Sequence, residues 1–183
     1  MDLTVLGILE FSSIAVGIKS LDAMVKASPV IIVDAKTICP GKYLVVITGD
    51  VASVEYSLNA GRETGTGFLA DEMFLPMVHR DVVEAIGKTQ DTGDWDSIGI
   101  IETYSVVSSI EAADVAAKTG GVRIVEIRLS MGLGGKSYVK MMGDLYSVEA
   151  AMKAGTVKAE RKGLLCSDII IPKPHEDIKK YFI

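Results

Sequence analysis

The chain has 183 residues, of which 49% are hydrophobic and 23% charged, with a formal net charge of −5. An acidic balance argues against a nucleic-acid partner, which would need a basic face. No apolar run reaches the roughly 18 residues of a transmembrane helix, and the start at Met1-Asp2 lacks the basic region of a signal peptide. Two cysteines cannot form a disulfide framework. We therefore expect a soluble protein of a reducing, cytosolic compartment.

The sequence contains two copies of one unit. Leu-Gly-Ile-Leu-Glu at 6–10 recurs as Ile-Gly-Ile-Ile-Glu at 98–102, which is 92 positions later. The offset rises to 94 where Gly49-Asp50 is repeated as Gly143-Asp144, and to 96 at His79 and His175. So many ordered matches indicate a duplication. The first increase lies near 36–42, so the two copies differ in length there.

Each copy has the same predicted order of elements. Hydroxyl residues precede the first helix and Gly-Asp precedes the second, as helix caps do. Pro76 and Pro172 end the last strand of each copy, because proline does not fit inside a strand ladder. The expected strands are 5–10, 30–38, 43–47 and 68–75, then 97–102, 122–129, 137–142 and 164–171, and the expected helices are 13–27, 51–62, 106–118 and 145–158, with short helices over 79–87 and 175–182.

This order predicts an α+β sandwich made of two tandem ferredoxin-like βαββαβ domains. The expected domains are 1–88 and 97–183, joined by a polar linker at about 89–96. Each domain is small, and two equivalent units in one chain suggest a pseudosymmetric assembly in which a trimer imitates a hexamer.

The stretch 36–42, Lys-Thr-Ile-Cys-Pro-Gly-Lys, joins two β-branched apolar runs and is expected to be the tip between two strands. Pro40 and Gly41 suit a turn, so Cys39 would be exposed. Cys166 lies inside a predicted strand, where a lone intracellular cysteine is usually a small buried hydrophobic residue. We expect that ordinary role for Cys166 and a functional one for Cys39.

Three other patterns have simpler explanations than a catalytic or binding site. Ser130 to Ser137 resembles a phosphate-binding loop, but a strand follows it where that motif needs a helix. His79 and His175 match no zinc spacing, and their repetition indicates that each orders the turn after a fourth strand. No nucleophile, base and orienting acid form a recognisable set, so we expect a protein that is not an enzyme.

The combined motifs resemble the tandem shell proteins of bacterial microcompartments, the trimeric pseudohexameric class. The resemblance covers nearly the whole chain, in an unpermuted order of elements. Its marks are DAMVKA at 22–27, GKYLVVITGDVASVE at 41–55 and IPKPHEDI at 171–178. KTICPGK at 36–42 and MGLGGKSYV at 131–139 are similar to members that carry an iron–sulfur cluster.

The resemblance implies a role for Cys39. In that family the tip between the second and third strands lines a central pore, so three chains would bring three Cys39 thiolates together. Thiolates suit iron–sulfur clusters, and three of them imply one 4Fe-4S cluster per trimer with one iron left for an outside ligand. The expected surroundings of the cluster and pore are Ile38, Pro40, Gly41, Gly132, Gly134 and Gly135.

The resemblance also implies contacts between tiles. Lys26 and Lys118 end the first helix of each copy, and the matching lysine of the family lies at the tile edge; His79 and His175 are expected near a subunit boundary. The implied partners are two further copies in a homotrimer, other shell proteins and an encapsulated redox enzyme, with no nucleic acid and no membrane.

Three functions stay open at this point. The first is a trimeric shell tile whose cluster transfers electrons across the shell or is itself delivered. The second is a tile with a passive metabolite pore lined by Cys39. The third is a ferredoxin-like regulator or redox enzyme outside any shell, although a self-contained ferredoxin would carry its full set of cluster cysteines in one chain.

Overall fold

The computed structural model describes residues 4–90 and 95–182. The chain forms two compact units, each described here by itself. The first runs to Val78 and includes Met131–Gly135; the second comprises His79–Ser130 and the chain from Lys136 onward. Residues 91–94 of the predicted linker lie outside the described residues. The domain boundaries at 88 and 97 stay a prediction, and segment 79–90 lies in the second unit.

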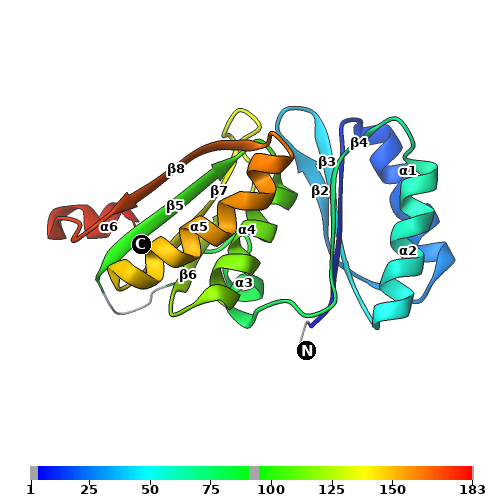
Figure 1. Ribbon diagram of the computed structural model, residues 1–183. Coiled ribbons are helices and arrows are strands. Elements are labelled where there is room, and N and C mark those ends of the chain that lie inside the picture. The colour runs from blue at the N-terminus through cyan, green and yellow to red at the C-terminus, as the bar shows by residue number, and fades with distance from the viewer. Residues whose placement is uncertain (1–3, 91–94, 183) are drawn as a thin grey trace. The chain divides into compact units, whose positions relative to one another are not determined.

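The first unit contains one antiparallel sheet in the order β2-β3-β1-β4, with helices α1 and α2 on one face (Figure 1). Its elements are β1 (Leu6–Phe11), α1 (Ile14–Ala27), β2 (Ile31–Ile38), β3 (Lys42–Thr48), α2 (Val51–Thr64) and β4 (Leu69–Leu75).

The second unit repeats this architecture with the sheet order β6-β7-β5-β8. Its elements are α3 (Arg80–Ala85), β5 (Ser97–Thr103), α4 (Val106–Thr119), β6 (Arg123–Arg128), β7 (Ser137–Gly143), α5 (Leu145–Arg161), β8 (Leu165–Ile171), a 3-10 turn (Glu176–Ile178) and α6 (Lys179–Phe182). Two βαββαβ copies confirm the predicted fold class. Within the described residues, no helix is long and apolar enough to cross a bilayer.

The duplication extends to the irregular features of the sheets. β2 has a register shift between Ile32 and Asp34, and β6 has one between Ile124 and Glu126. Ile32 pairs with Ile47 of β3, and Ile124 pairs with Met141 at the same place on β7. The bulges therefore establish the structural equivalence of Ile32 with Ile124.

Helix starts follow the caps that the sequence indicates. The Asp50 and Asp144 carboxylates accept hydrogen bonds from the backbone N–H three residues on, at 2.9 and 3.0 Å. Ser13 and Ser105 cap α1 and α4 in the same way. Each side chain satisfies a donor that the first helical turn leaves without a partner.

The repeated glycine of the first strand allows helix and sheet to approach closely. A Cβ at Gly7 would lie 2.7 Å from Val54 Cγ1, and a Cβ at Gly99 would lie 2.8 Å from Met152 Sδ. Val54 is on α2 and Met152 on α5. A larger residue would overpack either core, so the glycine explains why the motif recurs in both copies.

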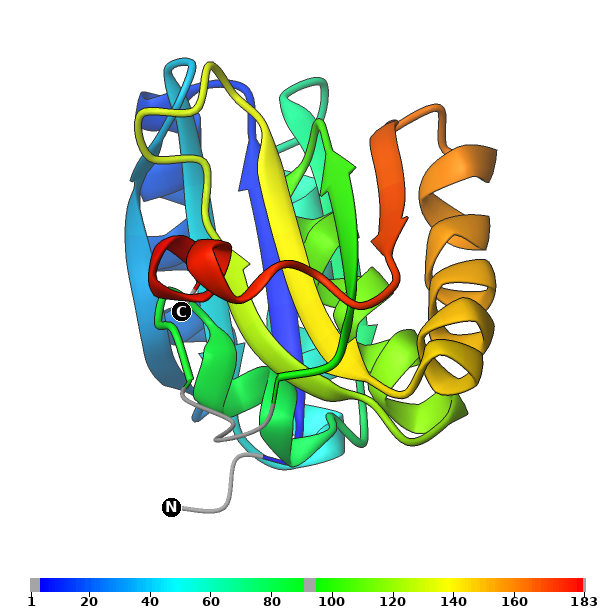
Figure 2. The same cartoon turned by 90° about the vertical axis from the view of Figure 1, so that its left-hand side faces the viewer.

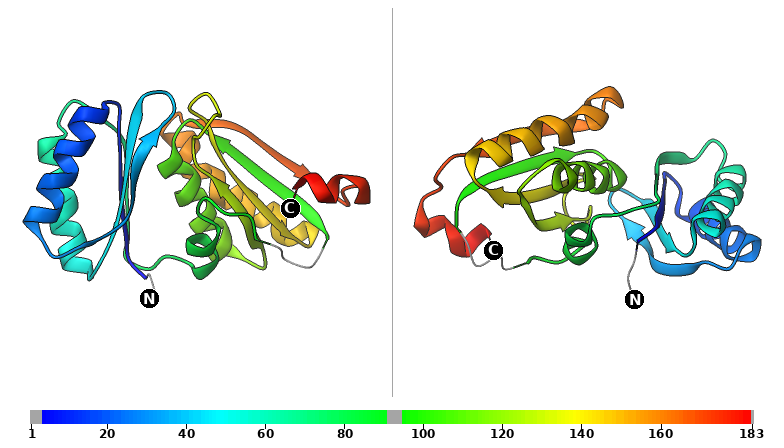
Figure 3. Two further views of the ribbon diagram at one scale, coloured as in Figure 1. Left: turned by 180° about the vertical axis from the view of Figure 1, so that it is seen from behind. Right: turned by 60° about the horizontal axis from the view of Figure 1, so that its bottom comes forward.

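Segment 79–90 lies against α4 and β6 of the second unit, as the views in Figure 3 show for α3. Ile86 forms a bridge with Ile127, and Thr89 forms one with Glu126. Gly87 N–H donates to the Ile127 carbonyl at 2.9 Å. The outer edge of β6 is therefore partly covered by backbone pairing.

The C-terminal helix α6 lies over the sheet of the second unit (Figure 2). Phe182 is buried in a cluster with Ile98, Val125 and Met142. Its ring meets that of Trp95 edge to face, with centroids 5.8 Å apart. One face of this short helix is thus fixed to its own unit.

Glu126 of β6 is a buried carboxylate with several side-chain partners. It accepts from Thr89 Oγ1 at 3.1 Å and from Tyr138 Oη at 3.1 Å, and Lys140 Nζ lies 2.9 Å away. Burial raises the pKa of Glu126, but the hydrogen bond and charge of Lys140, with the bonds from Thr89 and Tyr138, outweigh it. The net pKa lies below its ordinary value of 4.5.

Replacing Glu126 by Gln tests this network. The folded-state pKa is lowered, so the carboxylate's contribution is present above pH 4.5 and is lost as the pH falls through the folded pKa. Glu126→Gln should lower the free energy of unfolding at pH 7 by about 1–3 kcal/mol, with the difference fading in acid. Urea titrations at several pH values measure it. Asp34→Asn, at the equivalent position of β2, is the matched control and should cost less. A pH-independent difference would contradict the assignment.

Candidate functional site

Cys39 stands in a tight turn at the tip of the β2–β3 hairpin. The two strands stay paired up to Ile38 and Lys42, which leaves only residues 39–41 to reverse the chain. Pro40 and Gly41 are exposed, Cys39 is half-buried, and Ile38 is buried. Gly41 has φ +69°, a conformation that glycine adopts most readily. The predicted turn thus brings the thiol to an exposed hairpin tip.

The lysine after each tip forms an ion pair. Lys42 Nζ lies 2.8 Å from Glu10 Oε1, and Lys136 Nζ lies 3.0 Å from Glu102 Oε1. The hydrogen bond with Glu102, followed by its charge, raises the pKa of Lys136. These ion pairs explain why Gly-Lys is repeated in both copies. In the first copy, Glu10 neutralises the charge of Lys42, the lysine near Cys39.

The glycine-rich loop Met131–Gly135 belongs to the first compact unit. Gly132, Gly134 and Gly135 all have positive φ, at 73°, 61° and 90°. A Cβ at Gly135 would lie 2.7 Å from Pro40 Cδ, whereas Gly132 and Gly134 face open space. The structure therefore brings Gly135 next to the Cys39 turn and gives the other two glycines a backbone role.

A single chain does not complete a metal site. In residues 4–90 and 95–182, no group of three or more His, Cys, Asp or Glu side chains could hold a metal ion. Both cysteines are free thiols. Among the described residues, Cys39 thus has no second cysteine beside it with which to bind a metal ion.

Cys166 lies in β8, as predicted, but the expectation that it is a buried core residue was wrong. It is half-buried, because β8 is an edge strand of its sheet. A hydrogen bond between the side chains of Tyr104 and Cys166, followed by the charge of Cys166, raises the pKa of Tyr104. This pair could not be predicted from the sequence, because the two residues are far apart in the chain.

The two histidines are helix caps. His79 Nδ1 accepts from Asp81 N–H, and His175 Nδ1 accepts from Asp177 N–H, both at 3.3 Å. Each orders the turn after the fourth strand of its copy, which is the structural role that their repetition suggests. Their place at a subunit boundary stays a prediction.

The two edge candidates, Lys26 and Lys118, lie in the last turns of α1 and α4, where a cation suits the helix dipole. Each pairs with the aspartate four residues earlier, Asp22 or Asp114, at 2.5 Å. Lys26 is the more exposed of the two and lines a shallow hollow of about 420 Å³ together with Tyr56 of α2.

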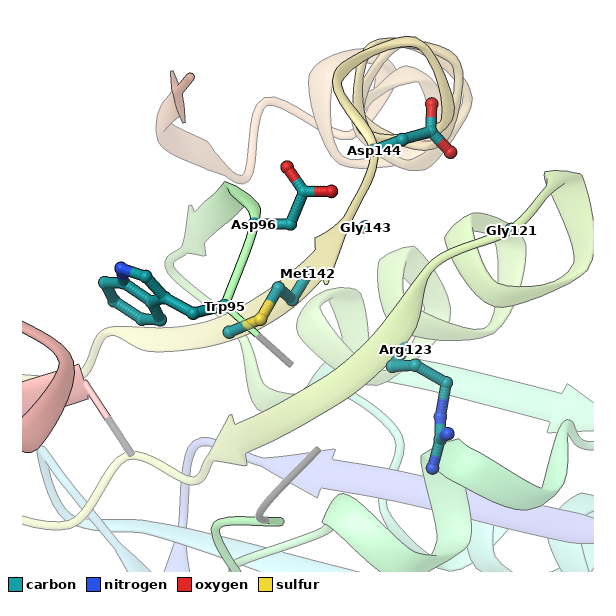
Figure 4. A pocket seen from close by; sticks show the side chains of 7 residues that line it. All are labelled: Trp95, Asp96, Gly121, Arg123, Met142, Gly143 and Asp144. Atoms are coloured by element: carbon teal, nitrogen blue, oxygen red, sulfur yellow. The ribbon is translucent and has the colours of Figure 1, made fainter. Parts of the chain in front are cut away.

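A hollow of about 330 Å³ in the second unit was not foreseen from the sequence (Figure 4). Its two carboxylates already bind local backbone: Asp96 accepts from Ser97 N–H at 2.6 Å, and Asp144 caps α5. Arg123 points away from them and pairs with Asp81 at 3.2 Å. These contacts give the lining residues structural roles.

Comparisons with known proteins agree with this geometry. The model of the BMC domain matches residues 5–78 and again 97–174. The chain is 38% identical to bacterial microcompartment shell protein PduT of Citrobacter freundii over 178 residues, which cover 97% of each chain. It is 37% identical over 87 residues to shell protein EutM of Salmonella typhimurium, covering 48% of this chain and 88% of that one.

A solved structure shows the same fold. The crystal structure of a microcompartment protein from Desulfitobacterium hafniense superimposes with a TM-score of 0.84. The two sequences are 45% identical, and the match covers 98% of this chain and 99% of the other. The similarity therefore extends over both copies.

Replacing Cys166 by Ala should change the free energy of unfolding by only about 0.5 kcal/mol, because the side chain is half-exposed. The same change removes the main cause of the raised pKa of Tyr104, which should fall towards 10.0. NMR titration of 13C-labelled tyrosine measures it, with Cys39→Ala as the control. An unchanged Tyr104 titration would contradict the pairing.

Proposed function

Because the chain belongs to the BMC domain family, whose matched relatives are shell proteins of bacterial microcompartments, we propose that it builds the shell as a structural tile. It is a shell protein and not an enzyme. The observation that carries this proposal is the tandem repeat: a complete βαββαβ sheet unit occurs twice, and the BMC domain matches each copy.

The proposed tile is a homotrimer in which six equivalent domains form a pseudohexamer. Two equivalent units per chain support this arrangement, because a ring of three chains then imitates six-fold symmetry. Other shell proteins would surround the tile. Lys26 and Lys118, at the ends of α1 and α4, are its proposed edge residues.

The proposed cofactor is one 4Fe-4S cluster per trimer, held by Cys39 of each chain. The donor chemistry fits, since thiolates are the usual ligands of such clusters, and Cys39 is a free thiol at a hairpin tip. The small Gly135 beside Pro40 keeps bulky side chains away from the turn. One chain offers one thiol there, so the site depends on the trimer.

When bound, such a cluster would supply one-electron chemistry, either for electron transfer across the shell to an encapsulated redox enzyme or for delivery of the cluster itself. Each chain would contribute one sulfur on a short turn, and the trimer would place the three sulfurs around one axis. The Glu10 carboxylate neutralises the positive charge of Lys42, the cation that follows the turn. The alternative is a tile with a passive pore lined by Cys39. Substitution of Cys39 distinguishes this alternative from the tile that holds a cluster.

Replacing Cys39 by Ser should abolish the cluster completely, because one substitution removes all three protein ligands. Serine keeps the size but supplies a hydroxyl, a poor ligand for iron–sulfur clusters. The wild type, reconstituted anaerobically with iron and sulfide, should show broad visible absorbance that the variant lacks, with an unchanged trimer mass in both.

Cys166→Ala is the matched control and should keep the iron. A wild-type trimer that stays colourless after reconstitution would contradict the cluster and leave the passive pore. A stable wild-type monomer in sedimentation would contradict the tile itself.

Charge reversal at Lys26 together with Lys118 tests the edge role. Lys26→Glu with Lys118→Glu should keep the trimer mass of the wild type but lower its thermal stability, because each new carboxylate lies beside Asp22 or the buried Asp114. Sheet formation seen by electron microscopy should fall about tenfold or more, since the proposed edge loses its cations. Lys19→Glu with Lys153→Glu, at exposed positions of α1 and α5, is the control for the added negative charge. Normal sheet formation by the Lys26→Glu, Lys118→Glu variant would contradict the proposed edge role of these lysines.

A further inference from the structure

The glycine-rich loop is longer than the hairpin tip that it repeats. β6 and β7 stay paired up to Arg128 and Tyr138, so the loop spans residues 129–136, whereas residues 39–41 alone join β2 to β3. The three glycines of the loop all have positive φ. Glycine loses more conformational freedom on folding than any other residue. Ordering this loop is therefore costly, and a contact at Gly135 explains what the loop is ordered against.

Gly135 differs from the other two glycines of the loop. It is buried, and a Cβ placed on it would lie 2.7 Å from Pro40 Cδ and 3.6 Å from the Cys39 carbonyl oxygen. Gly132 and Gly134 are exposed and face open space. The loop and the Cys39 turn belong to the same compact unit. The backbone at Gly135 thus lies against the turn at a distance that only glycine permits.

The chain that follows Gly135 is anchored. Ser137 Oγ donates to the Arg128 carbonyl oxygen at 2.6 Å, which ties the start of β7 to the end of β6. Lys136, directly after Gly135, forms its ion pair with Glu102 of β5 at 3.0 Å. Because the base of the loop is held on this side, Gly135 has little room to move away from the turn.

We infer that Gly135 is a positioning residue for Cys39: because it has no side chain, it sets where the Pro40 ring lies, and with it the neighbouring thiol. This inference rests on the proposed cluster, which three thiolates can share only if each sulfur is correctly placed. Pro40 Cδ is bonded to the backbone nitrogen, so the ring cannot turn aside from a new methyl group, and the turn itself has to move.

The size of that movement decides whether it matters. To bring the methyl group and Pro40 Cδ from 2.7 Å to an ordinary contact of 3.4 Å, the turn has to shift by about 0.7 Å. A binding site of this kind tolerates displacements of only about 0.5 Å. A methyl group at Gly135 should therefore move the thiol too far for full cluster binding.

Gly135→Ala and Gly132→Ala, compared before any cluster is added, test the inference. Both are made together with Cys166→Ala, so that Cys39 is the one thiol of each chain. Both place alanine at positive φ, at 90° and 73°, but only the first meets Pro40. The thiol of Gly135→Ala should react with dithiobis(nitrobenzoate) about threefold or more faster than that of Gly132→Ala, because the displaced turn is more accessible.

Anaerobic reconstitution with iron and sulfide gives a second readout. Gly132→Ala should take up as much iron per trimer as the Cys166→Ala parent, whereas Gly135→Ala should take up about half or less. Circular dichroism and sedimentation should show both variants folded and trimeric, so that loss of structure does not explain the difference.

Pro40→Ala provides a rescue test, which also serves if Gly135→Ala alone does not fold. It removes the ring carbons that the new methyl group would meet. The double variant should fold, and its Cys39 thiol should react at nearly the rate of Pro40→Ala alone. A double variant that stays unfolded would overturn the inference, because the methyl group would then clash with something other than Pro40.

The outcomes separate the inference from the proposed cluster. Equal thiol rates and equal iron in Gly135→Ala and Gly132→Ala would overturn the inference and leave the cluster standing. With a parent that takes up iron, a difference in only one of the two readouts would overturn it as well. A parent that stays colourless would overturn the cluster, and the thiol rates would still decide whether Gly135 positions Cys39.

Discussion

An edge strand that carries apolar side chains has to be covered, and this constraint separates the two copies of the repeat. β2 and β6 have the same bulge and the same pairing with the next strand. Within residues 4–90 and 95–182, a segment pairs along the outer side of β6, with a bridge from Ile86 to Ile127, and no such bridge is found along β2. An uncovered apolar edge invites pairing with another chain, so the first unit is the one that needs a neighbour.

The segment that covers β6 also takes part in a polar network of the second unit. Thr89 of the covering segment donates to Glu126, which Tyr138 and Lys140 bind from β7. The equivalent strand β3 has Leu44 and Val46 opposite Lys36 and Asp34, so the first unit cannot build the same network. Buried polar networks specify one arrangement when every member is satisfied. The two copies thus share a backbone but are stabilised differently.

Local features of this fold could be predicted from the sequence, and non-local ones could not. The cap at Asp50 and the turn around Cys39 depend on a few adjacent residues. Because the sequence is duplicated, each helix and strand could be predicted independently in both copies. The exposure of Cys166 and the burial of Ile124 depend on sheet order and on a segment about 40 positions away in the chain for Ile124. Periodicity along one strand does not carry that information.

The difference between the two hairpin tips has a consequence for ring stoichiometry. The first tip is a three-residue turn with Cys39, whereas the second is a longer loop that contains three glycines and no cysteine. A ring of six identical domains can present a side chain six times or not at all. In the proposed trimer, joining two unlike copies in one chain would halve that number, so the ring would offer three thiols, the number that a cluster with one open iron requires.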